Sequence, residues 1–203
     1  MGVYGVNIEK ETLEYYNINA NEFAEQTQKV DFSSIQKKFI DLLNPTSLIL
    51  DFGCGAGRDT KFFVEAGYEV EAWDGSPELC QIASEYSGVK VENKLFNELQ
   101  EKEKYDGIWA CSSILHLQLP ELKDVLGRIV MALKHGGIFY TSFKYGNFEG
   151  NRNGRYFTDM TENTFAALLQ DYSQIEIIDS WRTGDVRPGR ESEQWLNLIM
   201  RRK

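Results

Sequence analysis

The chain is poor in cysteine and has no long apolar run. Its 203 residues include only Cys54, Cys80 and Cys111, which are odd in number and far apart. This spacing suits neither a disulfide framework nor a CxxC metal site, so we expect a reducing compartment and no metal. No apolar segment approaches the roughly 20 residues that a bilayer-spanning helix needs. We therefore expect a cytoplasmic protein with no membrane partner.

Positive charge is also scarce. The 22 lysines and arginines are outnumbered by 31 aspartates and glutamates, which gives a formal net charge of −9. Acidic residues spread along the chain repel phosphate backbones, and the only short basic cluster is Arg201, Arg202 and Lys203 at the end of the chain. We therefore expect no nucleic-acid partner.

The chain lacks internal repeats, low-complexity stretches and linkers rich in proline, glycine or serine. Residues 1–203 are thus expected to form a single domain, with enough apolar residues (42%) for a substantial core. Helical and strand patterns alternate along it, and the last two strand patterns have no helix between them. The prediction is an α/β fold with a Rossmann-like, doubly wound, seven-stranded and mostly parallel sheet that ends in an antiparallel C-terminal strand. The expected strands are residues 48–52, 68–74, 89–93, 105–111, 137–143, 174–181 and 193–201.

A glycine-rich loop follows the first expected strand. In open α/β sheets, ligands sit at the carboxyl ends of the strands. Gly53, Gly55 and Gly57 allow positive φ angles and a close approach of backbone amides to a ligand. Asp51 ends the first strand, and Asp74 ends the second, at the distance where an acid accepts hydrogen bonds from ribose hydroxyls. The pattern predicts a nucleoside ligand.

A dinucleotide is the competing ligand. The fingerprint GxGxxG needs its third glycine where this chain has Arg58. Asp51 would repel a pyrophosphate but would attract a cationic amine. A nicotinamide-dependent oxidoreductase is therefore a weaker alternative than a protein whose ligand carries a positive amine.

With DFGCGAGRDT, AWDGS, YDGIWACSSILHL and LKHGGIFYTSFKYG, the chain resembles the class I S-adenosylmethionine-dependent methyltransferases from Leu48 onward. The resemblance implies S-adenosylmethionine as cofactor, with the methionine part near the glycine loop, the ribose at Asp74 and the adenine near Phe96 and Asn97. Cys111 would contact the cofactor, or serve as a small buried apolar residue. The cofactor-binding residues that the resemblance implies in this core are Asp51, Gly53, Cys54, Gly55, Gly57, Arg58, Asp74, Gly75, Ser76, Phe96, Asn97 and Cys111.

The segment EYYNINANEFAEQT looks like the cap of that family. It implies an N-terminal helical cap over residues 1–45, in front of a Rossmann-like core over 46–203. The cap would lay Tyr15 or Tyr16 over the cofactor pocket; an aromatic helix packed on the sheet is the alternative.

Methyl transfer from a sulfonium is an in-line displacement that depends mainly on alignment and exclusion of water. His116, just past the fourth strand, is the best placed candidate base; otherwise it lines the pocket or caps a helix. Trp195 would close the pocket or belong to the core. Lys144, Arg155, Asp185, Arg187 and Arg190 are expected in loops on the acceptor side, where they indicate a small anionic acceptor or are solvated charges.

The chain has no DPPY or NPPY after the fourth strand, so exocyclic amines of DNA, RNA or glutamine are unlikely acceptors by this comparison. We expect a methyltransferase that acts on a small molecule and is a monomer or a homodimer. A sensor or scaffold that binds S-adenosylmethionine without turnover is the alternative.

Overall fold

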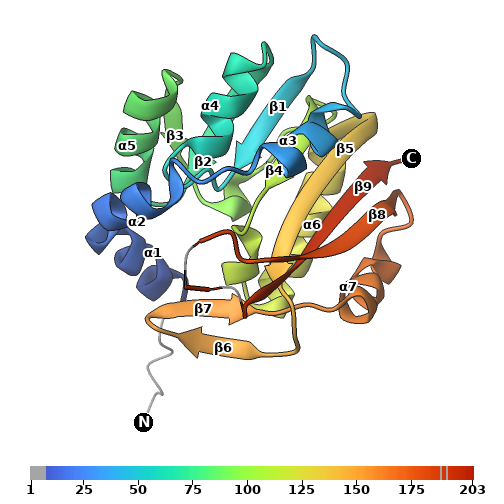
Figure 1. Ribbon diagram of the computed structural model, residues 1–203. Helices are drawn as coiled ribbons and strands as arrows, with labels where there is room; N and C mark the ends of the chain where they lie inside the picture. Colours follow the sequence, from blue (N-terminus) through green and yellow to red (C-terminus); the bar gives the residue numbers. More distant parts are fainter. Residues whose placement is uncertain (1–7, 188, 191) are drawn as a thin grey trace.

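The computed structural model describes residues 8–187, 189–190 and 192–203, so residues 1–7 of the expected cap lie outside the described part. Seven strands form one sheet in the order β3-β2-β1-β4-β5-β9-β8 (Figure 1). Strand β9 runs antiparallel to both of its neighbours, and the other pairs are parallel. The predicted fold class is confirmed. The strands are β1 (Leu48–Phe52), β2 (Glu69–Asp74), β3 (Val91–Asn93), β4 (Tyr105–Ala110), β5 (Leu133–Lys144), β8 (Ile175–Gly184) and β9 (Gln194–Arg202).

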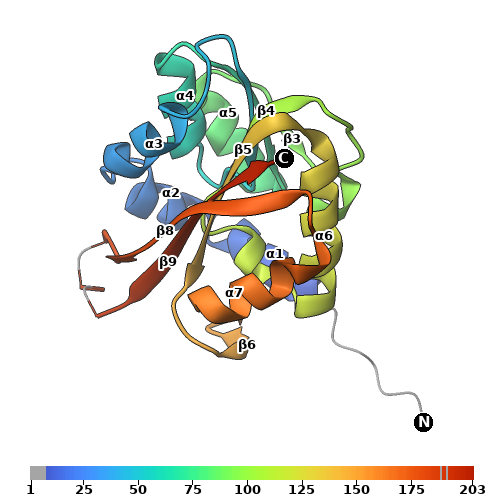
Figure 2. The same ribbon diagram turned by 90° about the vertical axis from the view of Figure 1, so that its right-hand side faces the viewer.

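The central strands are apolar on both faces because helices cover both sides of the sheet. Successive residues of β1 illustrate this: Ile49 packs in the core of one face, and Leu50 packs in the core of the other. Helices α3 (Ser33–Ile40), α4 (Arg58–Glu65) and α5 (Pro77–Ser87) cover the first face, and α6 (Leu119–Ala132) and α7 (Glu162–Leu168) cover the second (Figure 2). The sheet thereby becomes a rigid central layer.

Strand order reverses beside β1. The chain runs from β1 outward through β2 to β3 and then returns to place β4 on the other side of β1. Loops that leave β1 and β4 diverge to opposite sides, which opens a crevice at the carboxyl ends of these strands. The fold thus positions a ligand site at this edge.

Helices α1 (Ile8–Ile18) and α2 (Ala20–Thr27) lie across this edge of the sheet (Figure 1). Helix α3 differs from them, because its Ile35 and Phe39 pack with Phe63 of α4 and Trp109 of β4. Only the first two N-terminal helices therefore flank the crevice, whereas the third belongs to the layer on the sheet.

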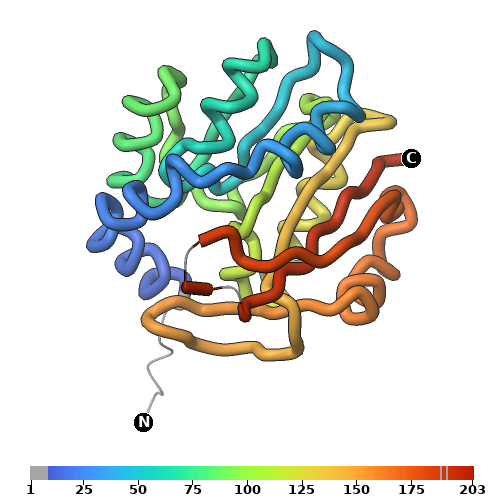
Figure 3. The backbone as a smooth tube through the Cα atoms, viewed as in Figure 1, coloured from blue at the N-terminus to red at the C-terminus, as the bar shows by residue number. Residues whose placement is uncertain are grey.

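A small hairpin follows β5 where the sequence predicted a loop. Strands β6 (Glu149–Arg152) and β7 (Arg155–Thr158) pair antiparallel, and the chain then continues into α7 (Figure 3). Asn153 and Gly154 turn the hairpin with φ values of 51° and 78°, and Asn-Gly is the preferred pair for such a turn. The expected loop position of Arg155 is therefore wrong, because Arg155 begins strand β7. The sequence contains the turn signal, but the two strands that flank it have only four residues each, which is too short for a recognisable strand pattern.

In the described part of the chain, no helix combines the length and the apolar character that spanning a bilayer requires.

Candidate active site

A cavity of about 500 Å³ opens at the carboxyl ends of β1, β2, β4 and β5. Helix α1, helix α2, the β6–β7 hairpin and the segment between β8 and β9 contribute the other walls. Most of the predicted site residues line it, but Tyr15, Asp51, Gly57, Ser76 and Asn97 do not. The predicted residues that line it are Tyr16, Gly53, Cys54, Gly55, Arg58, Asp74, Gly75, Phe96, Cys111, His116, Lys144, Arg155, Arg187 and Trp195.

The three glycines of the loop have different tasks. All adopt positive φ angles, of 84°, 56° and 84° for Gly53, Gly55 and Gly57. A Cβ on Gly53 would lie 2.5 Å from Cβ of Ser113, so only glycine allows this backbone to pack against Ser113 in the cavity wall. A Cβ on Gly57 would instead meet the backbone of Ala83 in α5 at 3.0 Å. The first two glycines therefore shape the cavity, and the third allows α4 and α5 to pack closely.

Asp74 lies at the tip of β2 and faces the cavity. One carboxylate oxygen accepts a hydrogen bond from the Gly55 N–H at 2.8 Å, and the other accepts one from the Ser76 N–H at 2.9 Å. Burial raises the pKa of Asp74 to about 6, although the two N–H groups oppose this shift. Both oxygens keep further lone pairs, so the carboxylate can still accept hydroxyl groups.

Ser76 is a structural residue. It is fully buried, its hydroxyl accepts a hydrogen bond from the Leu79 N–H at the start of α5, and it donates to Asn17 of α1 at 2.5 Å. The side chain therefore caps α5 and ties it to α1. The structure does not bring Ser76 into the cavity.

Asp51 lies behind the glycine loop rather than in the cavity wall. Its side chain is buried and accepts a hydrogen bond from the Thr60 hydroxyl at 2.6 Å. Burial, together with the nearby Asp59, raises the pKa of Asp51 well above its usual range. Asp51 is therefore a buried residue behind the glycine loop, and it has no direct place in the cavity wall.

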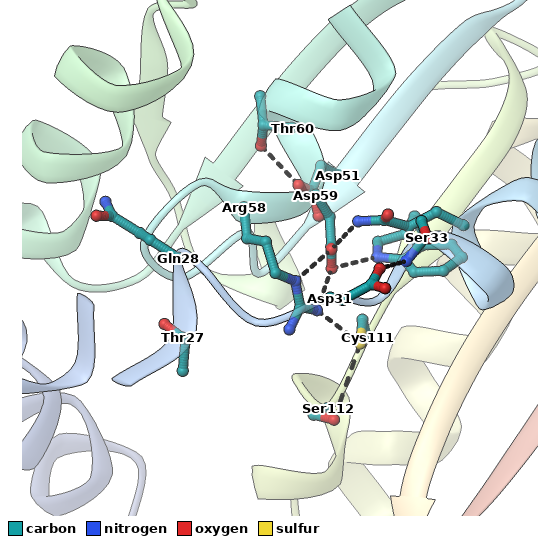
Figure 4. Close-up of polar contacts among 12 residues, drawn as sticks. Thr27, Gln28, Asp31, Ser33, Asp51, Arg58, Asp59, Thr60, Cys111 and Ser112 are labelled. Atoms are coloured by element: carbon teal, nitrogen blue, oxygen red, sulfur yellow. Dashed lines mark hydrogen bonds and ion pairs between the residues drawn. The ribbon is translucent and has the colours of Figure 1, made fainter. Parts of the chain in front are cut away.

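Asp59 was not predicted as a site residue, but its carboxylate lines the cavity. Figure 4 shows its polar contacts. Arg58 donates to both of its oxygens, from Nε at 2.7 Å and from Nη2 at 2.9 Å. Gln36 and the Trp109 indole add donors at 2.7 and 2.8 Å. Burial acts to raise the pKa of Asp59, but Arg58 and these donors outweigh it and lower the pKa. The only sequence signal was an acid in the first turn of α4, a common position for a helix-stabilising carboxylate.

Arg58 also approaches Cys111 of the cavity wall, with Nη2 at 3.8 Å from Sγ. The thiol stays protonated at neutral pH, because burial raises the pKa of Cys111 to about 12. Cys111 is thus both a small packed side chain and a lining residue.

Phe96 and Asn97 separate at the short 3-10 helix η1 (Phe96–Glu98). Phe96 lines the cavity and packs edge-on against Phe52, with ring centroids 4.9 Å apart. Asn97 is exposed and faces a smaller hollow beside Pro120 and Glu121. Successive residues in a 3-10 turn point about 120° apart, so the two side chains cannot share one ligand face. The structure does not bring Asn97 to the predicted adenine site.

His116 ends the short helix η2 (Ile114–His116) and connects two walls of the cavity. Its Nδ1 lies 2.6 Å from the carbonyl oxygen of Tyr156, and its Nε2 lies 2.8 Å from the Tyr16 hydroxyl. A carbonyl oxygen only accepts, so Nδ1 carries the hydrogen. In the neutral ring, Nε2 is then the acceptor, and Tyr16 donates to it.

Burial lowers the pKa of His116 to about 4, and the positive charges of Arg155 and Lys144 act in the same direction. The Tyr156 carbonyl opposes this shift without reversing it. Burial raises the pKa of the Tyr16 phenol, so this group remains protonated at neutral pH. The pair is therefore a neutral imidazole whose unprotonated Nε2 accepts a hydrogen bond from the Tyr16 hydroxyl.

The expected acceptor-side charges are mostly paired. Lys144, the last residue of β5, forms an ion pair with Glu193, and Arg190 contacts the same glutamate at 3.2 Å. Arg187 pairs with Asp185 at 2.5 Å, and the Trp195 indole donates to this aspartate at 3.1 Å. Despite its burial, these donors hold the pKa of Asp185 at about 2. This part of the cavity wall is an ordered ionic network.

Tyr15 does not line the cavity. Its ring lies under the guanidinium of Arg155, with 4.4 Å between the ring centroid and Cζ. Of the two expected tyrosines, Tyr16 is therefore the one in the cavity, and Tyr15 supports Arg155.

Within residues 8–187, 189–190 and 192–203, no group of three or more His, Cys, Asp or Glu side chains is arranged to hold a metal ion.

Residues 49–137 match the sequence family described as a methyltransferase domain. This segment includes the glycine loop, Asp74, Cys111 and His116. No curated protein matches the chain.

Several solved structures are similar across almost the whole chain. One is the 1,6-didemethyltoxoflavin-N1-methyltransferase of Burkholderia thailandensis with 1,6-didemethyltoxoflavin and S-adenosylhomocysteine bound (TM-score 0.79, 20% identity, 100% of this chain and 93% of that chain). Another is the magnesium protoporphyrin IX methyltransferase of Synechocystis with bound S-adenosylmethionine (0.76, 15%, 100% and 100%). A third is an N-methyltransferase of Bradyrhizobium japonicum with S-adenosylhomocysteine (0.67, 13%, 92% and 97%).

The chain thus carries a methyltransferase domain at residues 49–137 and has the fold of S-adenosylmethionine-dependent methyltransferases, in agreement with the predicted resemblance. The methylated or demethylated cofactor bound in these three structures agrees with the predicted cofactor.

Proposed function

We propose that this protein transfers the methyl group of S-adenosylmethionine to an O–H or N–H group of a small acceptor by in-line displacement, with His116 as the proton acceptor. The observation that carries this proposal is the neutral His116 ring. Its basic Nε2 faces the Tyr16 hydroxyl inside the cavity that the glycine loop shapes.

The residues present fit the cofactor. Gly53 and Gly55 line the cavity without side chains, so a ligand can approach the backbone of the glycine loop closely. The fixed Asp59 carboxylate in the wall suits the α-amino group of the methionine part. Asp74 suits the ribose hydroxyls, and the Phe96 ring suits the face of the adenine.

The cofactor supplies a methyl group on a positively charged sulfur, which is a reactive electrophile. The protein has to align the acceptor with this group and keep water out. His116 takes the proton of the acceptor at Nε2, directly or through the Tyr16 hydroxyl, because its lowered pKa keeps that nitrogen unprotonated at pH 7. The Tyr156 carbonyl steadies the imidazolium that forms, by accepting the Nδ1 hydrogen.

A small acceptor is supported by the site and by similar proteins. The Burkholderia structure holds the small heterocycle 1,6-didemethyltoxoflavin. The net charge of −9 opposes nucleic acid as a substrate. A cytoplasmic location and a monomeric or homodimeric state remain predictions.

A binding protein without turnover is the second candidate. It would need the glycine loop and the Asp74 carboxylate, but it has no use for an imidazole nitrogen that can take up a proton inside the cavity. The nicotinamide alternative is weaker still, because the bulky Arg58, paired with Asp59, stands at the third glycine of that fingerprint.

The test is transfer of isotope-labelled methyl groups from S-adenosylmethionine into a library of small molecules. The proposal predicts labelled product with wild type. It also predicts that His116→Ala loses turnover but still binds S-adenosylhomocysteine. Binding of the cofactor pair without transfer to any compound class would favour the sensor.

A further inference from the structure

We propose that Arg155 is the anchor for a carboxylate of the acceptor, so the acceptor is a small carboxylic acid with its methyl-accepting O–H or N–H close to that carboxylate. This inference rests on the proposed function for the site, and it adds the chemical class of the acceptor.

Among the described residues, seven cationic side chains line the cavity, and six of them have a carboxylate partner. Arg155 is the exception in the described part of the chain. Its Nε is buried and has no hydrogen-bond partner there. Arg155 is half-buried and its guanidinium has no counterion, which makes it the cation of the described cavity wall with unused capacity for an anion.

Three aromatic rings pack around Arg155. Its Cζ lies 4.4 Å from the ring centroid of Tyr15, 5.3 Å from that of Phe157 and 5.7 Å from that of Tyr16. These rings stabilise the cation but cannot neutralise it. A ligand carboxylate can do so through paired N–H···O bonds, which the planar guanidinium is shaped to form.

Arg155 and His116 meet at one atom. The Tyr16 hydroxyl accepts from Nη1 of Arg155 at 3.5 Å and lies 2.8 Å from Nε2 of His116. An anion held by Arg155 is therefore close to the nitrogen that takes the acceptor proton. Only a compact arrangement, in which the nucleophilic group and the carboxylate are near neighbours, reaches both residues.

The neighbouring walls favour a flat acceptor. The Phe157 ring packs edge-on against His116 with centroids 4.8 Å apart, and Trp195 lines the same cavity. An aromatic acid with an ortho hydroxyl or amino group is flat, and it places its nucleophilic group next to its carboxylate.

The acceptor oxygen or nitrogen forms a bond to the methyl carbon, while its proton passes to Nε2 of His116. The carbon–sulfur bond breaks, and its electron pair stays on sulfur, which becomes the neutral thioether. The carboxylate on Arg155 keeps its charge throughout. The proton on His116 leaves to water after the product departs.

The experiment is calorimetric titration of the protein loaded with S-adenosylhomocysteine. The probes are 2-hydroxybenzoate and 2-aminobenzoate, each compared with its uncharged amide. The proposal predicts that wild type binds at least one acid at least tenfold more tightly than its amide. Arg155→Gln should abolish this preference. Arg155→Lys should retain part of it, because lysine keeps the charge but cannot form the paired N–H···O bonds of a guanidinium.

Arg190→Gln is the matched control, because Arg190 lines the same cavity but is paired with Glu193. It should keep the wild-type preference. If wild type binds S-adenosylhomocysteine without preferring either acid, or if Arg155→Gln keeps the preference, the carboxylate anchor is refuted and the proposed function stands. Failure of wild type to bind S-adenosylhomocysteine would instead refute the proposed function.

Discussion

The hydroxyl of Tyr16 lies 2.8 Å from Nε2 of His116, although 100 positions separate the two residues in the chain. Tyr16 belongs to α1, and His116 follows β4, so this contact joins the N-terminal helices to the rim of the sheet. The helix thereby holds the base in one orientation. The Tyr156 carbonyl fixes the other ring nitrogen from the β6–β7 hairpin.

Replacement of His116 tests the proton transfer. For His116→Gln we expect turnover to fall by about 10² to 10⁴, the usual contribution of a general base. The affinity for S-adenosylhomocysteine should change little, because His116 is not placed to hold the cofactor. Steady-state kinetics and calorimetry on the same preparations separate the two effects. Unchanged turnover would make His116 a structural residue.

The ionisation of His116 gives a second prediction. Since its pKa in the folded protein is lowered to about 4, the unfolded chain takes up the proton first as the pH falls below 6.5. Stability from this group is therefore present above pH 6.5 and lost towards pH 4, by about 1 to 3 kcal/mol. NMR titration tests the pKa directly. The chain has only two histidines, so His135→Gln assigns the signals. A His116 pKa above 6 would contradict the account.

Asp74 should control cofactor affinity. Asp74→Ala removes the carboxylate at the tip of β2, and we expect binding of S-adenosylhomocysteine to weaken by about 1 to 3 kcal/mol. Wild-type affinity should also fall as the pH drops below about 6, where Asp74 becomes protonated. Calorimetry at several pH values measures both effects. Glu92→Gln is the control, because Glu92 is exposed on the neighbouring strand. Equal affinity of Asp74→Ala and wild type would remove Asp74 from the cofactor site.

Gly57 and Gly67 form a matched pair for the packing argument. Both have positive φ, of 84° and 90°, but a Cβ meets the Ala83 backbone at 3.0 Å at Gly57 and nothing within 4 Å at Gly67. Gly67→Ala should lower the free energy of unfolding by about 1 to 2 kcal/mol through backbone strain alone. Gly57→Ala should cost about 2 to 5 kcal/mol, since overpacking adds to the strain. Urea unfolding measures both variants, and equal losses would argue against close α4–α5 packing at Gly57.

The sequence predicted the sheet because its strands are marked by local signals. These signals can be read from residues that are adjacent in the chain. Examples are the apolar run at residues 48–52 and the alternation of strand and helix patterns. The hairpin of β6 and β7 was not predicted because each strand has only four residues and β6 is polar, and only Asn153 and Gly154 marked it.

The site was predicted less completely, because tertiary pairing decides the role of each residue. Ser76 and Gly57 belong to the motif but serve helix capping and helix packing. Asp59 became part of the wall through partners that are distant in sequence, Gln36 and Trp109. Arg155 differs from the other described cations of the cavity because it has no carboxylate partner. The ion pairs of those other cations depend on the folded structure, and no spacing in the sequence reveals them.

The most direct test of the central claim is calorimetric titration of the wild-type protein with S-adenosylmethionine, S-adenosylhomocysteine and NAD. The account predicts micromolar binding of the first two and no binding of NAD, because the cavity suits a nucleoside with a cationic amino-acid tail. Binding of NAD alone would contradict the assignment of this cavity to S-adenosylmethionine.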